Sequence, residues 1–232
     1  MTIAIMQPYF LPYIGYFQLL YAVDRFVLYD DVNYINRGWV NRNNILLAGK
    51  PHLFTVPLQN ASQNKKIYEV TLSEDQAWRK KLLKTIQQAY QKAPHFEIVF
   101  QMLESILNTH SESIADLCYV SISTIATYLG LETEIISSSR KYENDLLKGQ
   151  ERILSICKLE EANRYINPIG GQELYDKDTF AKQDIDLYFI KTKPVSYPQL
   201  KNSFVPWLSI LDVLMFNNKD ETRTLLNEFE LI

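Results

Sequence analysis

Short apolar runs alternate with amphipathic segments along most of the chain. The apolar runs predict buried strands at Thr2–Met6, Arg25–Tyr29, Leu53–Val56, Glu132–Ile136, Arg164–Asn167 and Leu187–Ile190. Apolar residues at helical spacing predict helices at Tyr13–Val23, Glu74–Lys92, Phe96–Asn108, Glu112–Leu129, Gly149–Leu159, Ile210–Phe216 and Glu221–Glu230. This alternation predicts an α/β fold with a Rossmann-like parallel sheet flanked by helices.

The first strand, helix and strand follow one another closely, which predicts a compact βαβ unit with parallel strands. Further along, three consecutive predicted helices occupy residues 74–130, and Gly130 is a typical helix stop. We expect them to form a helical insert or layer within a single α/β domain spanning residues 1–232.

No charged residue occurs between Met1 and Val23. A signal peptide would begin with Lys or Arg and end at a small-residue cleavage site, and neither feature is present. Pro8 and Pro12 would break a membrane-spanning helix. We therefore expect a buried strand, loop and helix, no transmembrane segment and a cytoplasmic protein.

Composition narrows the function classes only slightly. The chain has 232 residues, with 24 Lys and Arg against 27 Asp and Glu, so its net charge of −3 gives no compositional case for a nucleic-acid partner. Cys118 and Cys157 fit no metal motif or disulfide framework and are expected to be small core residues. The sequence contains no Gly-rich phosphate loop, zinc motif or nucleophile elbow. A homo-oligomer is compatible with these features.

Ligands of open parallel sheets bind beyond the carboxyl ends of the strands, and three polar clusters follow predicted strands. The first cluster, Gln7–Phe17, has prolines that stiffen a loop and a Gly15 that permits close backbone approach. The N-terminus of the following helix suits an anion. The alternative is a Pro-stiffened turn whose aromatic side chains fill the core.

The second cluster is Asp30–Asn44. Asp30 and Asp31 could hold Mg²⁺ or orient a hydroxyl. Arg37 and Arg42 could bind phosphate or carboxylate in bidentate fashion. Asn41 and Asn43 could order the backbone or recognise polar ligand groups. The alternative is a solvated polar loop with local ion pairs.

The third cluster, Ser137–Arg140, places hydrogen-bonding side chains directly after a strand. Serines in such positions also serve as caps and turns, which is the alternative interpretation.

Several motifs resemble the WbqC-like protein family. They are the segment Gln7–Phe17 (QPYFLPYIGYF), Asp30–Tyr34 (DDVNY), Arg37–Asn43 (RGWVNRN), Lys148–Leu154 (KGQERIL), Tyr165–Gly171 (YINPIGG) and Phe204–Asp212 (FVPWLSILD). The resemblance spans nearly the whole chain. It implies a place in bacterial surface-polysaccharide (O-antigen-type) biosynthesis, with acyl or aminoacyl transfer onto an amino sugar as the suggested activity.

The order strand, Pro-containing loop, Gly, helix and strand is also similar to the opening of the nucleotidylyltransferase superfamily. Members of that superfamily carry a His-x-Gly-His motif, and this chain has Tyr13 and Tyr16 at the histidine positions. Neutral tyrosine cannot supply the cation that an imidazolium would. Ser137–Arg140 is similar to the superfamily's Ser-Ser-Thr-x-x-Arg motif but lacks its Thr and its full spacing.

The leading hypothesis is therefore a transferase that binds a nucleotide or nucleotide-linked amino sugar and moves an acyl, aminoacyl or nucleotidyl group. Mg²⁺ could accompany the nucleotide at Asp30 and Asp31. The candidate catalytic residues are Asp30, Asp31, Tyr16 and Arg42. The candidate binding residues are Gln7, Pro8, Phe10, Gly15, Tyr34, Arg37, Trp39, Asn41, Asn43, Ser138, Ser139 and Arg140.

Two other hypotheses come from different classes. One is a non-catalytic sugar- or partner-binding protein on a degenerate nucleotidylyltransferase-like fold, for which the missing histidines are the evidence. The other is an aromatic N-terminus that docks on a membrane surface or a partner enzyme, which predicts an exposed patch of Tyr9, Phe10 and Tyr13.

Overall fold

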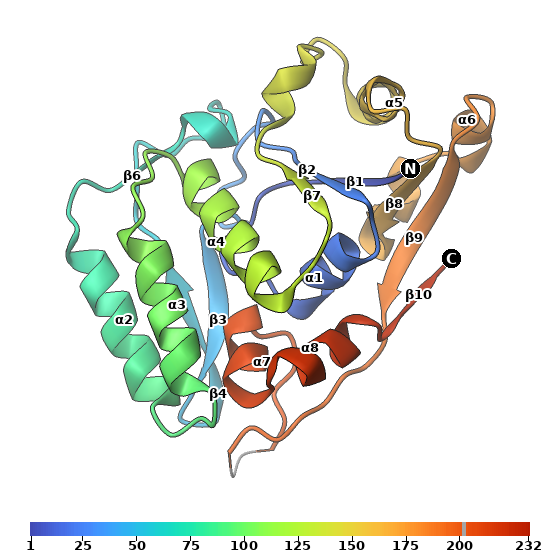
Figure 1. Cartoon of the computed structure of the whole chain (residues 1–232). Coiled ribbons are helices and arrows are strands. Elements are labelled where there is room, and N and C mark those ends of the chain that lie inside the picture. Colours follow the sequence, from blue (N-terminus) through green and yellow to red (C-terminus); the bar gives the residue numbers. More distant parts are fainter. Residues whose placement is uncertain (201–202) are drawn as a thin grey trace.

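The computed structural model describes residues 1–200 and 203–232 (Figure 1). Within these residues the main sheet has six strands in the order β10-β9-β8-β1-β2-β7. The strands are β1 (Thr2–Met6), β2 (Arg25–Leu28), β7 (Glu134–Ile136), β8 (Arg164–Pro168), β9 (Asp186–Thr192) and β10 (Phe229–Leu231). All pair in parallel except β10, which is antiparallel to β9. The predicted Rossmann-like α/β class is confirmed.

Helices cover both faces of the sheet. One face packs against α1 (Ile14–Tyr21), α4 (Ile114–Leu129), α7 (Ile210–Phe216) and α8 (Lys219–Leu226), and the other against α5 (Gly149–Leu159) and α6 (Lys177–Ala181). Alternate residues of β1 point to opposite faces: Ala4 joins the first cluster, whereas Ile3 and Ile5 join the second. The uncharged N-terminal segment is thus a buried central strand followed by a buried helix.

The connections place the carboxyl ends of β1, β2 and β7 next to one another. β1 continues through α1 into β2 on one side, while β8 and β9 lie on its other side. The strand order therefore reverses between β1 and β8, the position at which open α/β sheets form ligand crevices. The segments after β1, β2 and β7 all leave from this edge.

A helical layer stands beside the sheet. It contains α2 (Ala77–Tyr90) and α3 (Phe96–Asn108), which pack side by side with α4 (Figure 1). A capping box between Ser113 and Asp116 begins α4, and Gly130, with a φ of 66°, ends it in the left-handed conformation. These helices share one buried cluster with a face of the sheet.

Two elements differ from the sequence-based expectations. The polar stretch before Leu53 forms β3 (Arg42–Leu47), which pairs with β4 (Lys50–Thr55) in an antiparallel hairpin. The helix predicted to reach Glu230 ends at Leu226, and the chain returns as β10. In both strands, polar residues hide the strand pattern from the sequence.

The smaller elements complete the structure. They are β5 (Leu58–Gln59) with β6 (Thr71–Leu72), and the short 3₁₀ helices Ile67–Glu69, Ser139–Tyr142 and Ile169–Leu174. Cys118 and Cys157 are buried and free, as expected for core residues. Among residues 1–200 and 203–232, no helix combines the length and the apolar character needed to cross a bilayer.

Candidate functional site

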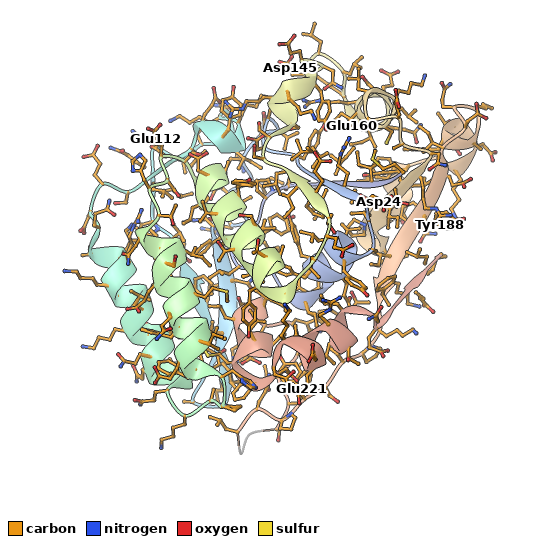
Figure 2. The ribbon with its side chains drawn as sticks, in the orientation of Figure 1. Asp24, Glu112, Asp145, Glu160, Tyr188 and Glu221 are labelled. Atoms are coloured by element: carbon orange, nitrogen blue, oxygen red, sulfur yellow. The ribbon has the colours of Figure 1, made fainter. Side chains whose placement is uncertain are left out.

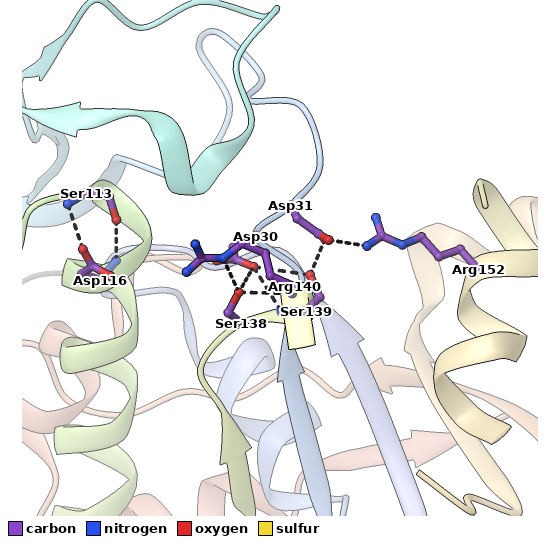
Figure 3. A network of polar contacts seen from close by, with 8 residues as sticks. All are labelled: Asp30, Asp31, Ser113, Asp116, Ser138, Ser139, Arg140 and Arg152. Carbon is purple, nitrogen blue, oxygen red and sulfur yellow. Dashed lines mark hydrogen bonds and ion pairs between the residues drawn. The ribbon is translucent and has the colours of Figure 1, made fainter. Parts of the chain in front are cut away.

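Two of the predicted polar clusters meet where β2 and β7 end (Figure 3). These strands pair in parallel, with Val27 opposite Ile136, so the residues that follow them leave the sheet together. Asp30 and Asp31 come from the end of β2, and Ser138, Ser139 and Arg140 come from the end of β7. The structure therefore brings together five of the residues predicted from sequence.

Asp30 is buried under hydrogen bonds from the third cluster. Its Oδ1 accepts hydrogen bonds from Ser138 Oγ at 2.8 Å and from the Ser139 backbone N–H at 3.1 Å. Arg140 Nε lies 3.9 Å from the other carboxylate oxygen. Burial raises the pKa of Asp30 above its usual value, although the Ser138 hydrogen bond and the Arg140 charge oppose this shift. Asp30 thus fixes the conformation of the Ser138–Ser139 turn through these hydrogen bonds.

Asp31 accepts a hydrogen bond from Ser139 Oγ and forms a buried ion pair with Arg152 of α5. The Arg152 guanidinium also lies 4.9 Å from the centroid of the Tyr29 ring, and its Nε donates to Asn144 Oδ1 at 3.0 Å. Arg152 was missed by the sequence reasoning. Its position on the apolar side of a helix, within the Lys148–Leu154 motif, is the signal that could have found it.

A polar cavity of about 250 Å³ opens beside this network, lined by Asp31, Lys66, Tyr68, Arg140, Glu143 and Asp145. Asp145 lies at the top of the molecule in the view of Figure 2. The Arg140 guanidinium stacks 4.5 Å from the centroid of the Tyr68 ring. Lys66 and Arg140 can bind a phosphate or carboxylate here, and the acidic groups can bind an amine or a hydroxyl.

The donor set for a divalent cation is small. Among the described residues, no three His, Cys, Asp or Glu side chains are grouped so that they could hold a metal ion. A Mg²⁺ at Asp30 and Asp31 would have to complete its octahedron with water and substrate oxygens, as Mg²⁺ at nucleotide sites commonly does.

The loop after β1 is rigid. Leu11, with a φ of 48°, points its carbonyl at two buried donors, Asn43 Nδ2 and Ser209 Oγ, each at 2.8 Å. Tyr16 is buried, and its hydroxyl donates to the Gln7 carbonyl at 3.0 Å. Burial raises the pKa of Tyr16 well above its usual value. The hydroxyl of Tyr16, a candidate catalytic residue, therefore helps to hold the loop.

Aromatic side chains of this loop do not form an exposed patch. Pro8 and Phe10 are buried, with Phe10 at 0% exposure, while Tyr9 and Tyr13 are half-buried. The predicted exposed patch of Tyr9, Phe10 and Tyr13 is therefore wrong at Phe10, and docking through the two partly exposed tyrosines stays a prediction.

The rest of the second cluster supports the β3–β4 hairpin. Tyr34 donates its hydroxyl to Asn41 Oδ1 at 2.9 Å, and Asn41 Nδ2 donates to the Val56 carbonyl at 2.8 Å. Arg42 Nε donates to the Gly38 carbonyl at 2.9 Å, and the guanidinium lies 5.7 Å from the centroid of the Trp39 ring. The arginines in contact with Asp30 and Asp31 are thus Arg140 and Arg152.

Arg37 occupies an exposed turn with a φ of 61°. Its side chain is therefore presented to solvent at the start of the segment that leads into β3, and its role as a phosphate ligand stays a prediction.

Another buried carboxylate, Asp212 of α7, was not predicted as a site residue. It accepts hydrogen bonds from Tyr90 and Tyr197 hydroxyls, both at 2.8 Å, and from Gln199 Nε2 at 2.6 Å. Burial raises the pKa of Asp212 above its usual value, although the three hydrogen bonds oppose this shift. The group ties α2, α7 and the segment after β9 together.

Comparisons with known proteins agree with the motifs. The sequence profile of the WbqC-like protein family matches residues 7–224. An uncharacterized protein of Mycobacterium tuberculosis is 30% identical over 218 residues, which are 93% of this chain and 93% of the relative. No solved structure matches the chain. The match extends over both the polar network and the rigid loop, and the chain belongs to the WbqC-like protein family.

Proposed function

We propose that this protein is a transferase of bacterial cell-surface polysaccharide biosynthesis that acts on a nucleotide-linked amino sugar. The single observation that carries this proposal is the polar cavity at the carboxyl ends of β2 and β7. Cations and carboxylates together line a space there that suits a small, charged ligand.

The charged groups that line the cavity suit different parts of such a ligand. Lys66 and Arg140 would hold phosphate oxygens, with Arg140 oriented by its stacking on Tyr68 and its hydrogen bond to Ser138 Oγ at 2.9 Å. Asp31 would orient an amino group or a Mg²⁺. Phosphoryl and acyl transfer both depend on such positioning and charge stabilisation.

The transferred group is the finer part of the proposal. In acyl or aminoacyl transfer the sugar nitrogen forms a bond to the acyl carbon, the leaving group departs from that carbon, and the proton that the nitrogen loses ends on the leaving group. Asp31 would accept a hydrogen bond from that nitrogen. Nucleotidyl transfer would use the same cations on phosphate.

Calorimetric titration tests the proposal. ATP, CTP and UDP-N-acetylglucosamine are titrated into the protein with and without Mg²⁺. We expect at least one of them to bind and Arg140→Gln to weaken that binding at least tenfold. Arg164→Gln is the matched control, because Arg164 also stacks on a tyrosine, 5.1 Å from the centroid of Tyr188, but at the start of β8 on the opposite edge. Absence of all binding, or equal losses in the two variants, would contradict the proposal.

A non-catalytic binding protein is the second candidate, and one observation favours it. Tyr16 stands where the His-x-Gly-His motif of the nucleotidylyltransferase superfamily, which this segment resembles, has histidine, and its hydroxyl donates to the Gln7 carbonyl. Binding at the polar cavity without any transfer to an amino-sugar acceptor by mass spectrometry would support this candidate over the transferase.

A further inference from the structure

A second cavity, of about 230 Å³, lies beside the rigid loop and differs in character from the polar one. It is lined by Tyr9, Pro12, Tyr13, Trp39, Asn43 and Trp207. These residues come from three separate segments: the loop after β1, the approach to β3 with its first residues, and the approach to α7. None of the six side chains carries a charge, so the cavity suits a neutral ligand.

Two tryptophans in this cavity remain in contact with solvent. Trp39 is 48% exposed and Trp207 is 67% exposed. Large aromatic side chains are usually buried more fully, because each one removes a large apolar area from water. Exposed aromatic groups at the wall of a cavity therefore indicate a ligand site more strongly than single ones scattered on a convex surface.

The backbone around Trp207 is held in a costly conformation. Trp207 has a φ of 62°, a left-handed value that large residues rarely adopt. Gln199 brackets Val205, accepting from its backbone N–H at 2.7 Å and donating to its carbonyl at 3.1 Å. On the other side, the Ser209 backbone N–H donates to the Asn44 carbonyl at 2.8 Å. The fold therefore holds the backbone on both sides of this exposed ring.

Gly15 sets the position of the Tyr13 ring, which forms another wall of the cavity. A Cβ at this position would lie 2.6 Å from both the Cζ and the hydroxyl oxygen of Tyr13, so the ring occupies the space that the glycine leaves. The Tyr13 ring in turn meets Trp207, with 6.0 Å between centroids and 56° between planes. The two rings form a concave aromatic corner.

Two tyrosine hydroxyls and one carboxamide can form hydrogen bonds with a ligand at this corner. In the described part of the chain, neither the Tyr9 nor the Tyr13 hydroxyl has a hydrogen-bond partner. Burial raises the pKa of both side chains above the usual value, so both stay neutral donors and acceptors at physiological pH. Asn43 adds a carboxamide whose position is fixed by Leu11 and by the Asn44 backbone N–H.

The ring geometry discriminates between the two ligands that aromatic walls commonly bind. A flat nucleobase is gripped best between parallel ring faces, and Tyr13 and Trp207 are neither parallel nor separated by a slot. A pyranose is thicker, has C–H groups that face the negative faces of aromatic rings, and has hydroxyls at its rim that pair with neutral polar groups.

We infer that the cavity formed by Tyr9, Pro12, Tyr13, Trp39, Asn43 and Trp207 is a pyranose-binding subsite. This inference rests on the proposed function. The subsite would hold the sugar of the donor or of the acceptor, while the polar cavity holds the charged groups. Its ligand is an uncharged hexopyranoside or N-acetylhexosaminide.

The chain offers a direct reporter of this subsite. It contains three tryptophans, Trp39, Trp78 and Trp207, and Trp78 belongs to α2, away from the cavity lining. The indole N–H region of a ¹H–¹⁵N spectrum therefore holds two signals from the subsite and one internal control. Trp39→Phe and Trp207→Phe assign the two signals.

The test titrates the protein with methyl N-acetyl-β-D-glucosaminide, methyl β-D-glucoside and uridine. We expect a glycoside to shift the Trp39 and Trp207 signals along one binding curve and to leave Trp78 unchanged. Trp207→Ala should weaken the effect on Trp39 at least tenfold, while Leu174→Ala, which changes another exposed apolar side chain (71% exposed), should not. Circular dichroism checks that both variants are folded.

Two results would overturn the inference. If neither glycoside moves the Trp39 and Trp207 signals, the cavity is not a pyranose subsite. If uridine moves both signals at lower concentration than the glycosides, it is a nucleobase subsite. Failure of nucleotides to bind the polar cavity in calorimetry, with glycoside shifts intact, would instead contradict the proposed nucleotide-linked substrate and leave the subsite standing.

Discussion

Asp31 faces the polar cavity while remaining tied to Arg152 behind it. The side chains of this pair are 7% and 4% exposed. A buried ion pair contributes little over an apolar pair of the same volume, but a single buried charge without its partner is costly. The pair therefore fixes the position of the Asp31 carboxylate more than it stabilises the fold.

This argument predicts an asymmetric set of stabilities. Arg152→Met leaves Asp31 buried without its cation and should lower the free energy of unfolding by about 3–5 kcal/mol. The double variant Asp31→Asn with Arg152→Met should lose less than the sum of the single losses. Urea denaturation measures each value. Arg140→Met is the control and should change stability by about 1 kcal/mol or less, because the Arg140 side chain is 55% exposed. Additive losses in the double variant would contradict the coupling.

At the scale of the element, the start of α1 contains a glycine that weakens the helix but leaves room for the Tyr13 ring. Ala is favoured over Gly in a helix by about 1 kcal/mol, yet Gly15 is kept where the Tyr13 ring packs. The atoms that a methyl group would meet belong to the end of a side chain, which can rotate away at modest cost. The glycine is thus needed for the cavity wall and not for the helix.

Gly15→Ala is therefore expected to separate binding from stability. The Tyr13 ring should leave Trp207, shifting the Trp207 indole signal and weakening glycoside binding, while the free energy of unfolding changes by less than about 1 kcal/mol. In a Tyr13→Ala background the ring is gone, and Gly15→Ala should stabilise the protein by up to about 1 kcal/mol. Destabilisation in that background would show that the methyl group meets something other than Tyr13.

The elements differ in how well sequence predicts them. α3, α5 and α7 begin and end at the predicted residues, because apolar side chains mark α3 and α5 as stripes and α7 as a continuous run. β3 was missed because Arg42, Asn43 and Asn44 are polar, and their strand conformation depends on pairing with β4. β10 was missed because a strand so short carries too few residues to show a period.

The candidate site divides in the same way. Parallel strands end at one edge, so the meeting of Asp30 and Asp31 with Ser138–Arg140 could be predicted from the order of the elements. Arg152 was missed because its partner is 121 residues away, and the only local signal is a charged residue among the buried positions of α5. The hydrogen bonds that Asp212 accepts were equally invisible, since no local pattern relates Tyr90 to α7.

At the scale of the whole molecule, Asp212 couples stability to pH. Burial raises its pKa in the folded protein above the unfolded value of about 3.9, so the folded state binds more protons in that range. Its contribution to stability is therefore complete below about pH 4 and is lost as pH rises through the raised pKa. Asp30 acts in the same direction.

Comparison with Asp212→Asn isolates this effect. Because asparagine does not titrate, the free energy of unfolding of the wild type minus that of the variant should fall as pH rises from about 4 to 7. Urea denaturation at successive pH values measures the difference. A difference that is flat or that rises with pH would show that the Asp212 pKa is not raised.

The Leu11 carbonyl has a consequence for how the protein is made. Its two donors, Asn43 and Ser209, lie 32 and 198 residues along the chain. A nascent chain emerging from the ribosome can fold β1, α1 and β2 early, because their contacts are local. The loop after β1 acquires its last support only after residue 209 has emerged, so a partly synthesised chain can have paired strands but an unfinished aromatic cavity.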